Sequence, residues 1–148
     1  MMKPLNVICC AAAMTAFPVA AAGLAQAEEQ PQKPALMLEL NAAQPSEKGC
    51  RLTFVVTNNL GGELSKAAFE VAMFNETGTV DRLTVLDFKD LPSGKTKVAR
   101  FDLGGADCGK ISRLLINTAT ECAGAGIEPP ACLRDLRTET KTQIAFGV

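Results

Sequence analysis

The cysteines are the residues with the greatest capacity for chemistry in this chain. The 148-residue sequence contains six, and four of them lie beyond the N-terminal apolar run, at Cys50, Cys108, Cys122 and Cys132. An even number of cysteines is typical of a disulfide framework, and four allow three pairings. Cys122 and Cys132 flank a short Gly/Pro-rich segment that can bend back on itself, so we predict that these two pair. Cys50 then pairs with Cys108.

Two other uses of four thiols are less favoured by the spacing. Zinc sites normally take ligands as close pairs such as C-x2-C, and no two of these four cysteines lie that near each other. A redox-active pair would be expected as C-x-x-C, which is absent. We therefore expect structural disulfides, with no metal site and no cofactor.

The composition removes several kinds of active site. The sequence contains no His, Trp or Tyr, so Ser-His and Cys-His nucleophile systems are impossible within this chain. The aromatic platforms that hold sugars or single-stranded nucleic acid are equally missing. The formal net charge is -1, with 15 basic and 16 acidic residues, so no field attracts nucleic acid or anionic lipid. We expect no nucleic-acid partner.

Carboxylate chemistry is the remaining catalytic possibility. Four carboxylates lie in or beside predicted strands: Glu70, Asp81, Asp87 and Asp102. Two of them across a cleft would act as acid and base, but a solvated outer face of a sheet is the favoured interpretation. Asp87 and Asp90, near Asp107, are candidate calcium ligands, although their spacing fits no recognised calcium loop.

A group of basic residues follows in the same part of the sequence: Arg82, Lys95, Lys97 and Arg100. They offer a small strip for an acidic partner. Alternating lysines on a strand also protect an exposed sheet edge against unwanted pairing, which needs no ligand. We favour the second interpretation.

Residues 1–27 have the layout of a secretory signal peptide. Lys3 precedes a mostly apolar run that ends in the small-residue triplet Ala25-Gln26-Ala27, which predicts cleavage before Glu28. An uncleaved membrane anchor is less favoured, because proline, glycine and many alanines weaken the run as a span. Two cysteines raise the possibility of lipidation, but they lie too early in the run. The alanine-rich run with its thin basic start predicts a Gram-negative periplasmic or secreted protein with no stable membrane insertion.

The remaining chain predicts one all-β domain. Residues 28–35 are polar and interrupted by proline, which indicates a flexible leader before a single domain at 36–148. Alternating apolar residues predict strands at 36–41, 50–57, 67–74, 80–88, 96–103, 111–117 and 142–146. Gly/Pro/Asn turns separate the strands, and no long helical period is present. We expect an immunoglobulin-like antiparallel β-sandwich of about seven strands, stapled by two disulfides.

Some strands invite finer predictions. The strand at 80–88 alternates poorly, which indicates a bulge or an edge position. Val98 and Phe101 have opposite parity, which predicts a bulge near Ala99-Arg100 if both are buried. The nearly continuous apolar run at 111–117 predicts a central strand covered on both faces. Residues 135–137 suggest a short helical turn.

The turn and core residues resemble a known class of module. Val55-x-x-Asn58, Val71-x-Met73-Phe74-Asn75-x-x-Gly78 and Leu91-Pro92-x-Gly94 are similar to the pattern of FxLYD-type and related immunoglobulin-like modules of exported bacterial proteins, over residues 36–117. The Tyr-Asp of that family is Phe74-Asn75 here. The two-disulfide pattern departs from the family and resembles small exported proteins of Gram-negative bacteria. The resemblance implies a fold and an address, with no shared catalytic residue.

These observations favour a non-catalytic binding or accessory module. Its expected partner is a protein or an envelope component, contacted through an edge strand or through the loop between Cys122 and Cys132. Holding a loop in place lowers the entropy lost on binding. The predicted contact residues are Gly124, Gly126, Ile127, Pro129 and Pro130. The alternatives are an inhibitor that presents this loop to a secreted hydrolase, and a small carboxylate-dependent enzyme.

Overall fold

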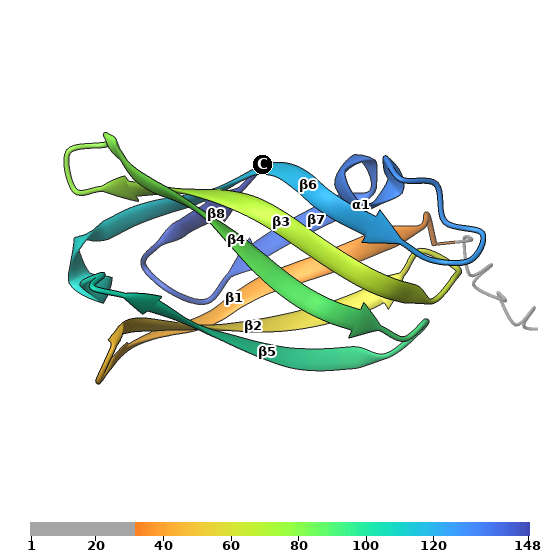
Figure 1. Cartoon of the computed structure of the whole chain (residues 1–148), viewed down its shortest axis with the longest axis horizontal. Helices are drawn as coiled ribbons and strands as arrows, with labels where there is room; N and C mark the ends of the chain where they lie inside the picture. Colours follow the sequence, from red (N-terminus) through yellow and green to blue (C-terminus); the bar gives the residue numbers. More distant parts are fainter. Residues whose placement is uncertain (1–31) are drawn as a thin grey trace, which may run out of the picture. The chain divides into compact units, whose positions relative to one another are not determined.

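The computed structural model describes residues 32–148, which form a β-sandwich of two four-stranded sheets (Figure 1). The first sheet has the strand order β5-β2-β1-β7 and the second β4-β3-β6-β8. The strands are β1 (Ala35–Ser46), β2 (Gly49–Asn59), β3 (Leu64–Asn75), β4 (Val80–Leu91), β5 (Thr96–Gly104), β6 (Ile111–Ala123), β7 (Leu136–Thr140) and β8 (Ala145–Gly147). A 3-10 turn, η1 (Cys108–Lys110), precedes β6, and a short helix, α1 (Ala131–Arg134), precedes β7. The predicted signal peptide lies outside the described residues.

The core lies between the two sheets because the strands alternate as the sequence indicates. In β1, Leu36, Leu38 and Leu40 are buried. Phenylalanines from facing sheets meet edge to face, with ring centroids 5.5 Å apart for Phe54 and Phe88. Such pairs contribute about 0.5–1.5 kcal/mol beyond the burial of their area. The β-sandwich and its alternating core were therefore predictable from the sequence.

The C-terminal part differs from the prediction. Two strands, β7 and β8, replace the one expected at 142–146, so the sandwich has eight strands. Each adds in parallel to its sheet, with Leu36 opposite Leu136 and Arg113 opposite Ala145, so the sheets are not wholly antiparallel. The helical turn expected at 135–137 is wrong. It occurs earlier, at α1, because Leu136 is buried as the first residue of β7.

Three predictions about single strands have different outcomes. β4 is an edge strand with irregular pairing to β3, as expected. The condition for a bulge near Ala99-Arg100 is not met, because Val98 points outward with 56% of its surface exposed, and β5 pairs with β2 without a shift. β6 is an interior strand, but Arg113 and Asn117 are exposed, so only one of its faces is covered. Among the described residues, the first strand, β1, begins at Ala35, one residue earlier than expected.

Both predicted disulfides are present. Cys50–Cys108 joins β2 to η1, and Cys122–Cys132 joins β6 to α1. The two bridges fasten opposite ends of the sandwich, since Cys50 lies near the start of β2 and Cys122 lies near the end of β6, beside the start of β3. Each of these ends gathers a different set of loops.

The open side between the edge strands β4 and β5 is bridged by two cationic side chains. Arg82 Nη1 donates to the carbonyl oxygen of Gly104 at 2.8 Å, and Lys97 Nζ donates to the carbonyl oxygen of Asp90 at 2.8 Å. β5 is thus an edge strand that carries Lys97, as the edge-protecting interpretation requires. The four predicted basic residues do not form one strip, because Arg82 and Lys97 span the open side whereas Arg100 lies opposite Thr53 on the outer face of its sheet.

Candidate partner-binding loop

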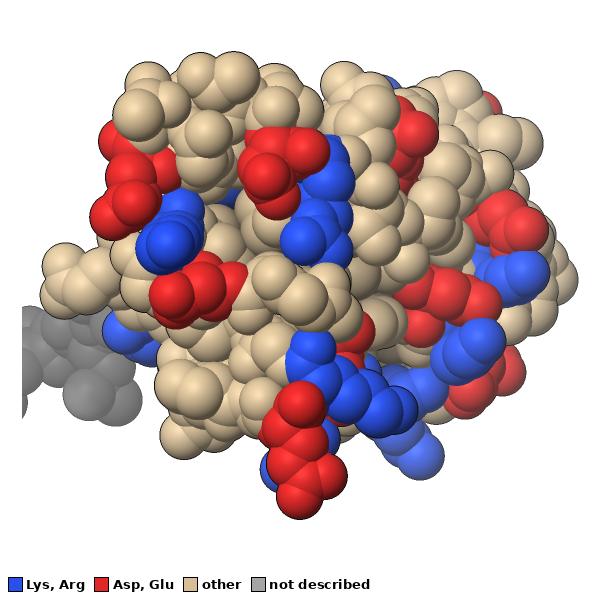
Figure 2. Space-filling view, turned by 60° about the vertical axis from the view of Figure 1, so that its left-hand side comes forward, with Lys and Arg blue, Asp and Glu red and all other residues tan. Residues whose placement is uncertain are grey.

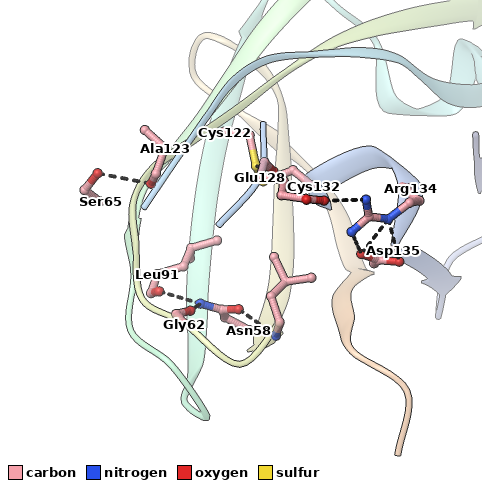
Figure 3. Close-up of a disulfide and its surroundings, with 11 residues drawn as sticks. Asn58, Gly62, Ser65, Leu91, Cys122, Ala123, Glu128, Cys132, Arg134 and Asp135 are labelled. Carbon is pink, nitrogen blue, oxygen red and sulfur yellow. Dashed lines mark hydrogen bonds and ion pairs between the residues drawn. A yellow bond between two sulfur atoms is a disulfide. The ribbon is translucent and has the colours of Figure 1, made fainter. Parts of the chain in front are cut away.

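The stapled loop, residues 124–130, connects β6 to α1 at one end of the sandwich. Cys122 and Cys132 close it on either side, and the Cys132 side chain is fully buried (Figure 3). Ser65 Oγ donates to the carbonyl oxygen of Ala123 at 3.1 Å, which ties the start of the loop to β3. The loop is therefore attached to the body of the domain at both of its ends.

The loop rests on the turn between β2 and β3 with no space between the two. A methyl group on Gly124 would collide with the backbone carbonyl of Glu63. A Cβ on Gly62 would lie 2.8 Å from Ile127 Cδ1. Ile127 is half-buried and packs against the hydrophobic core. Glycine at positions 62 and 124 thus permits the close approach that holds the loop in one place.

Asn58 supports the turn beneath the loop. Its side chain is buried, and Nδ2 donates to the carbonyl oxygens of Gly62 at 2.9 Å and Leu91 at 2.8 Å. Its Oδ1 accepts a hydrogen bond from the backbone N–H of Leu60 at 3.1 Å (Figure 3). The side chain uses both donors and one acceptor on three backbone groups, so one residue joins the β2–β3 turn to the end of β4.

Sequence reasoning did not single out Asn58 as part of the site. The sequence feature that could have indicated its role is its position in the strand, since Asn58 continues the alternating inward-facing series of Leu52, Phe54 and Val56. A polar residue at an inward position needs buried hydrogen-bond partners. In this fold those partners are the carbonyl oxygens of Gly62 and Leu91 and the N–H of Leu60.

The outward side of the loop is apolar and framed by an ion pair. Pro129-Pro130 are exposed, and Leu133 on α1 is 37% exposed. Arg134 Nη1 contacts Glu128 Oε2 at 2.9 Å, and its Nη2 contacts Asp135 Oδ2 at 2.9 Å. Its hydrogen bonds to Asp135, which have the larger effect, and to Glu128 raise the pKa of Arg134. The guanidinium thus fixes the loop to the end of α1.

The five predicted contact residues divide into two groups. Gly126, Pro129 and Pro130 are exposed to solvent. Gly124 and Ile127 instead lie against the body of the domain, where they position the loop. Leu133 and Arg134 extend the exposed surface beyond the predicted residues, because α1 follows the loop directly.

The four predicted carboxylates do not face one another across a cleft. Glu70 accepts a hydrogen bond from Asn117 Nδ2 at 2.6 Å on the outer face of the β4-β3-β6-β8 sheet. Asp102 pairs with Arg51 on the outer face of the other sheet, where N–O distances are 3.0 and 3.1 Å. Hydrogen bonds from Arg51 lower the pKa of Asp102.

The two other carboxylates, Asp87 and Asp81, have cationic neighbours. Asp87 contacts Lys89 Nζ at 2.7 Å, and hydrogen bonds from the Lys89 side chain and backbone lower its pKa. Asp81 contacts Arg82 at 3.3 Å. Each carboxylate is thus placed on the surface beside its own partner.

The candidate calcium ligands are not brought together. Asp87 and Asp90 lie on β4 beside Lys89 and Lys97 respectively, whereas Asp107 accepts the Gly109 N–H at the start of η1. Among residues 32–148, no group of three or more His, Cys, Asp or Glu residues is arranged to hold a metal ion.

A groove of about 380 Å³ lies at the other end of the sandwich, between the β3–β4 hairpin and the β5–β6 connection. Sequence reasoning did not predict it. Its lining includes the buried residues Met73, Ala106 and Ile111 and the charged residues Glu76, Asp81, Arg82, Asp107 and Lys110. Figure 2 shows basic and acidic side chains interspersed over one face of the molecule, and the groove has the same mixture of signs. This mixture selects no ligand charge.

The chain was compared with protein families, curated proteins and solved structures. No protein-family model and no curated protein matches the chain. Among solved structures, part of the chain is similar to the Salmonella enterica trimeric lipoprotein SadB, with a TM-score of 0.41 and 17% sequence identity. The similarity covers 47% of this chain and 40% of the SadB chain, and a likeness of this extent supports no assignment of function.

The disulfides carry the evidence for cellular location. Disulfides form and persist in oxidising compartments and are rare in the cytosol. The two bridges therefore indicate that the protein folds outside the reducing cytosol. In the part of the chain from residue 32 onward, no helix is long and apolar enough to cross a membrane.

Proposed function

We propose that this chain is a non-catalytic periplasmic or secreted binding module, which contacts a protein or envelope component through the stapled loop. The observation that supports this most directly is the attachment of the loop. A disulfide, the Asn58 hydrogen bonds and the contact of Gly124 with Glu63 all hold residues that expose Pro129-Pro130 to solvent. A signal-like leader and two disulfides support the location.

The attachment matters because ordering a loop opposes binding. Fixing the backbone of one residue costs about 1–2 kcal/mol, so a mobile seven-residue loop would lose several kcal/mol of affinity on becoming ordered. In this protein the loop is already ordered in the folded state, so binding does not have to order it. The neighbouring prolines restrict the backbone further, and the exposed Leu133 beside them supplies apolar area.

The inhibitor alternative uses the same surface and differs only in its partner. A disulfide-closed loop with an exposed Pro129-Pro130 is a shape that a hydrolase cleft can accept. Measuring the activity of a bound hydrolase distinguishes the binding module from the inhibitor, since only an inhibitor lowers that activity. The carboxylate alternative receives no comparable support, because each candidate carboxylate has its own surface partner.

The test is affinity capture from envelope extract, followed by binding measurements on each identified partner. The loop variant replaces Pro129, Pro130 and Leu133 by Ser, whereas the control variant is Val98→Ser, which alters an exposed apolar residue on β5. We expect the loop variant to lose at least about tenfold in affinity, or about 1.4 kcal/mol, and the control to bind like wild type. Equal binding by the loop variant and the wild type would overturn the proposal.

A further inference from the structure

The outer faces of the two sheets differ in character. The β5-β2-β1-β7 sheet presents charged residues to solvent, including the Arg51 and Asp102 pair. That sheet exposes one large apolar side chain, Val98 at 56%, whereas the β4-β3-β6-β8 sheet exposes three on the single strand β4: Val80, Leu83 and Val85, at 49%, 56% and 53% of their surface. An antiparallel sheet that faces water on one side normally carries polar residues there, so a contiguous apolar cluster on that side marks an interaction surface.

The strand register places further apolar side chains beside these three. Leu83 lies opposite Ala72, which lies opposite Leu115, and Leu115 lies opposite Gly147. Val80 lies opposite Phe74 in the same way. The apolar face is thus formed by Ala72, Phe74, Val80, Leu83, Val85 and Leu115. In its central row, which runs from Leu83 to Gly147, two leucines alternate with the small residues Ala72 and Gly147.

Opposite charges lie on either side of this central row. Arg113 lies opposite Phe74, one row to one side, with its guanidinium 5.5 Å from the Phe74 ring centroid. Glu70 lies opposite Val85 and Thr118, one row to the other side. Successive outward rows are about 6.6 Å apart along the strands and neighbouring strands about 4.8 Å apart, so the Cα atoms of Arg113 and Glu70 in one chain are about 14 Å apart, and the two side chains do not pair with each other.

We propose that a second copy of this chain covers the apolar face, in a two-fold dimer in which Arg113 of each copy pairs with Glu70 of the other. The two-fold axis runs along the central row, perpendicular to the strands. Rotation about it gives a second copy whose strands run in the opposite direction, and each strand lies over the same strand of the first copy. It places Arg113 of the second copy in the same row as Glu70, one strand spacing of about 4.8 Å to the side. Sheets that face each other are about 10 Å apart, a distance that Arg and Glu side chains bridge together.

This charge arrangement favours a second copy over other occupants. The face is self-complementary, because its positive and negative sides exchange under the two-fold rotation. The strand and row spacings give the apolar face an area on the order of 300 Å², which is small against the roughly 800 Å² per partner of a standard interface. The dimer therefore dissociates on dilution.

The test is sedimentation equilibrium of the processed protein over a wide concentration range, with a charge exchange between copies. We expect wild type to dimerise as concentration rises, and Leu83→Lys to stay monomeric. Arg113→Glu and Glu70→Arg should each raise the dimer dissociation constant about tenfold, and the double variant should restore it to near wild type. Restoration cannot come from within one chain, because the two charges are not neighbours there.

Arg100→Glu on the outer face of the other sheet is the matched control, and it should leave the association unchanged. Urea unfolding of each variant verifies that the fold is retained. A wild-type chain that is monomeric at every concentration would assign the face to another occupant and overturn the proposal. A dimer that Leu83→Lys leaves intact, or a double variant that fails to restore association, would overturn it as well.

Discussion

Replacing Asn58 by Ala tests whether one buried amide holds the base of the stapled loop. The change removes hydrogen bonds to the carbonyl oxygens of Gly62 and Leu91 and from the N–H of Leu60. A neutral hydrogen bond contributes about 1 kcal/mol net, and a buried group left without a partner costs about 1–3 kcal/mol. Two of the three bonds are only partly buried, so water replaces part of the loss. The expected destabilisation is about 3 kcal/mol.

Urea unfolding followed by circular dichroism measures this effect. With an m-value of about 1.5 kcal/mol/M, the unfolding midpoint of Asn58→Ala should fall by about 2 M while the m-value stays constant. Asn41→Ala is the matched control, because Asn41 is exposed and makes one side-chain bond, to Glu39. It should lose less than about 0.5 kcal/mol. A loss below about 1 kcal/mol for Asn58→Ala would refute the reasoning.

Three other predictions concern the bridges, a glycine and the acid limb. Changing both Cys122 and Cys132 to Ser should lower the free energy of unfolding by about 2.7 kcal/mol, and changing both Cys50 and Cys108 to Ser should lower it by about 4 kcal/mol. The difference follows from loop closure over sequence separations of 10 and 58 residues. If the Cys122/Cys132 variant had the lower urea midpoint, this prediction would be contradicted. Gly124→Ala should destabilise the domain by more than about 1 kcal/mol because of the Glu63 carbonyl, whereas Gly104→Ala, which meets nothing within 4 Å, should be near neutral in the same assay. The lowered pKa of Asp102 means that its stabilisation is present above its ordinary pKa of 3.8 and is lost as pH falls through the lower folded value. Stability measured between pH 2 and 6 should therefore fall less steeply for Asp102→Asn, and an unchanged acid limb would argue against the Arg51 pairing.

The sequence was sufficient for the core and the bridges because their signals are local. Leu36, Leu38 and Leu40 alternate within one strand, and the Gly/Pro segment beside Cys122 identified its partner. β7 was missed because its residues after Leu136 are polar, and its place depends on pairing with a strand about 100 residues earlier. Long-range pairing leaves no local period to read.

The candidate surfaces were predictable only in part. The sequence indicated the stapled loop, but not that Ile127 would turn inward against Gly62. The poor alternation at 80–88 has a physical cause, since Leu86 and Phe88 face the core while Leu83 and Val85 face outward. Apolar residues on both faces blur a period of two. A strand with a second apolar surface therefore looks irregular in sequence.

The parallel additions of β7 and β8 have a consequence for how the polypeptide matures. Leu36 has no parallel neighbour until Leu136 has been made, and Arg113 none until Ala145. Contacts between such distant residues form slowly, since a long stretch of chain must first be brought together. The antiparallel pairs among β1 to β6 do not depend on these strands, so each sheet gains its fourth strand, and its full width, only when residues 136–147 are available.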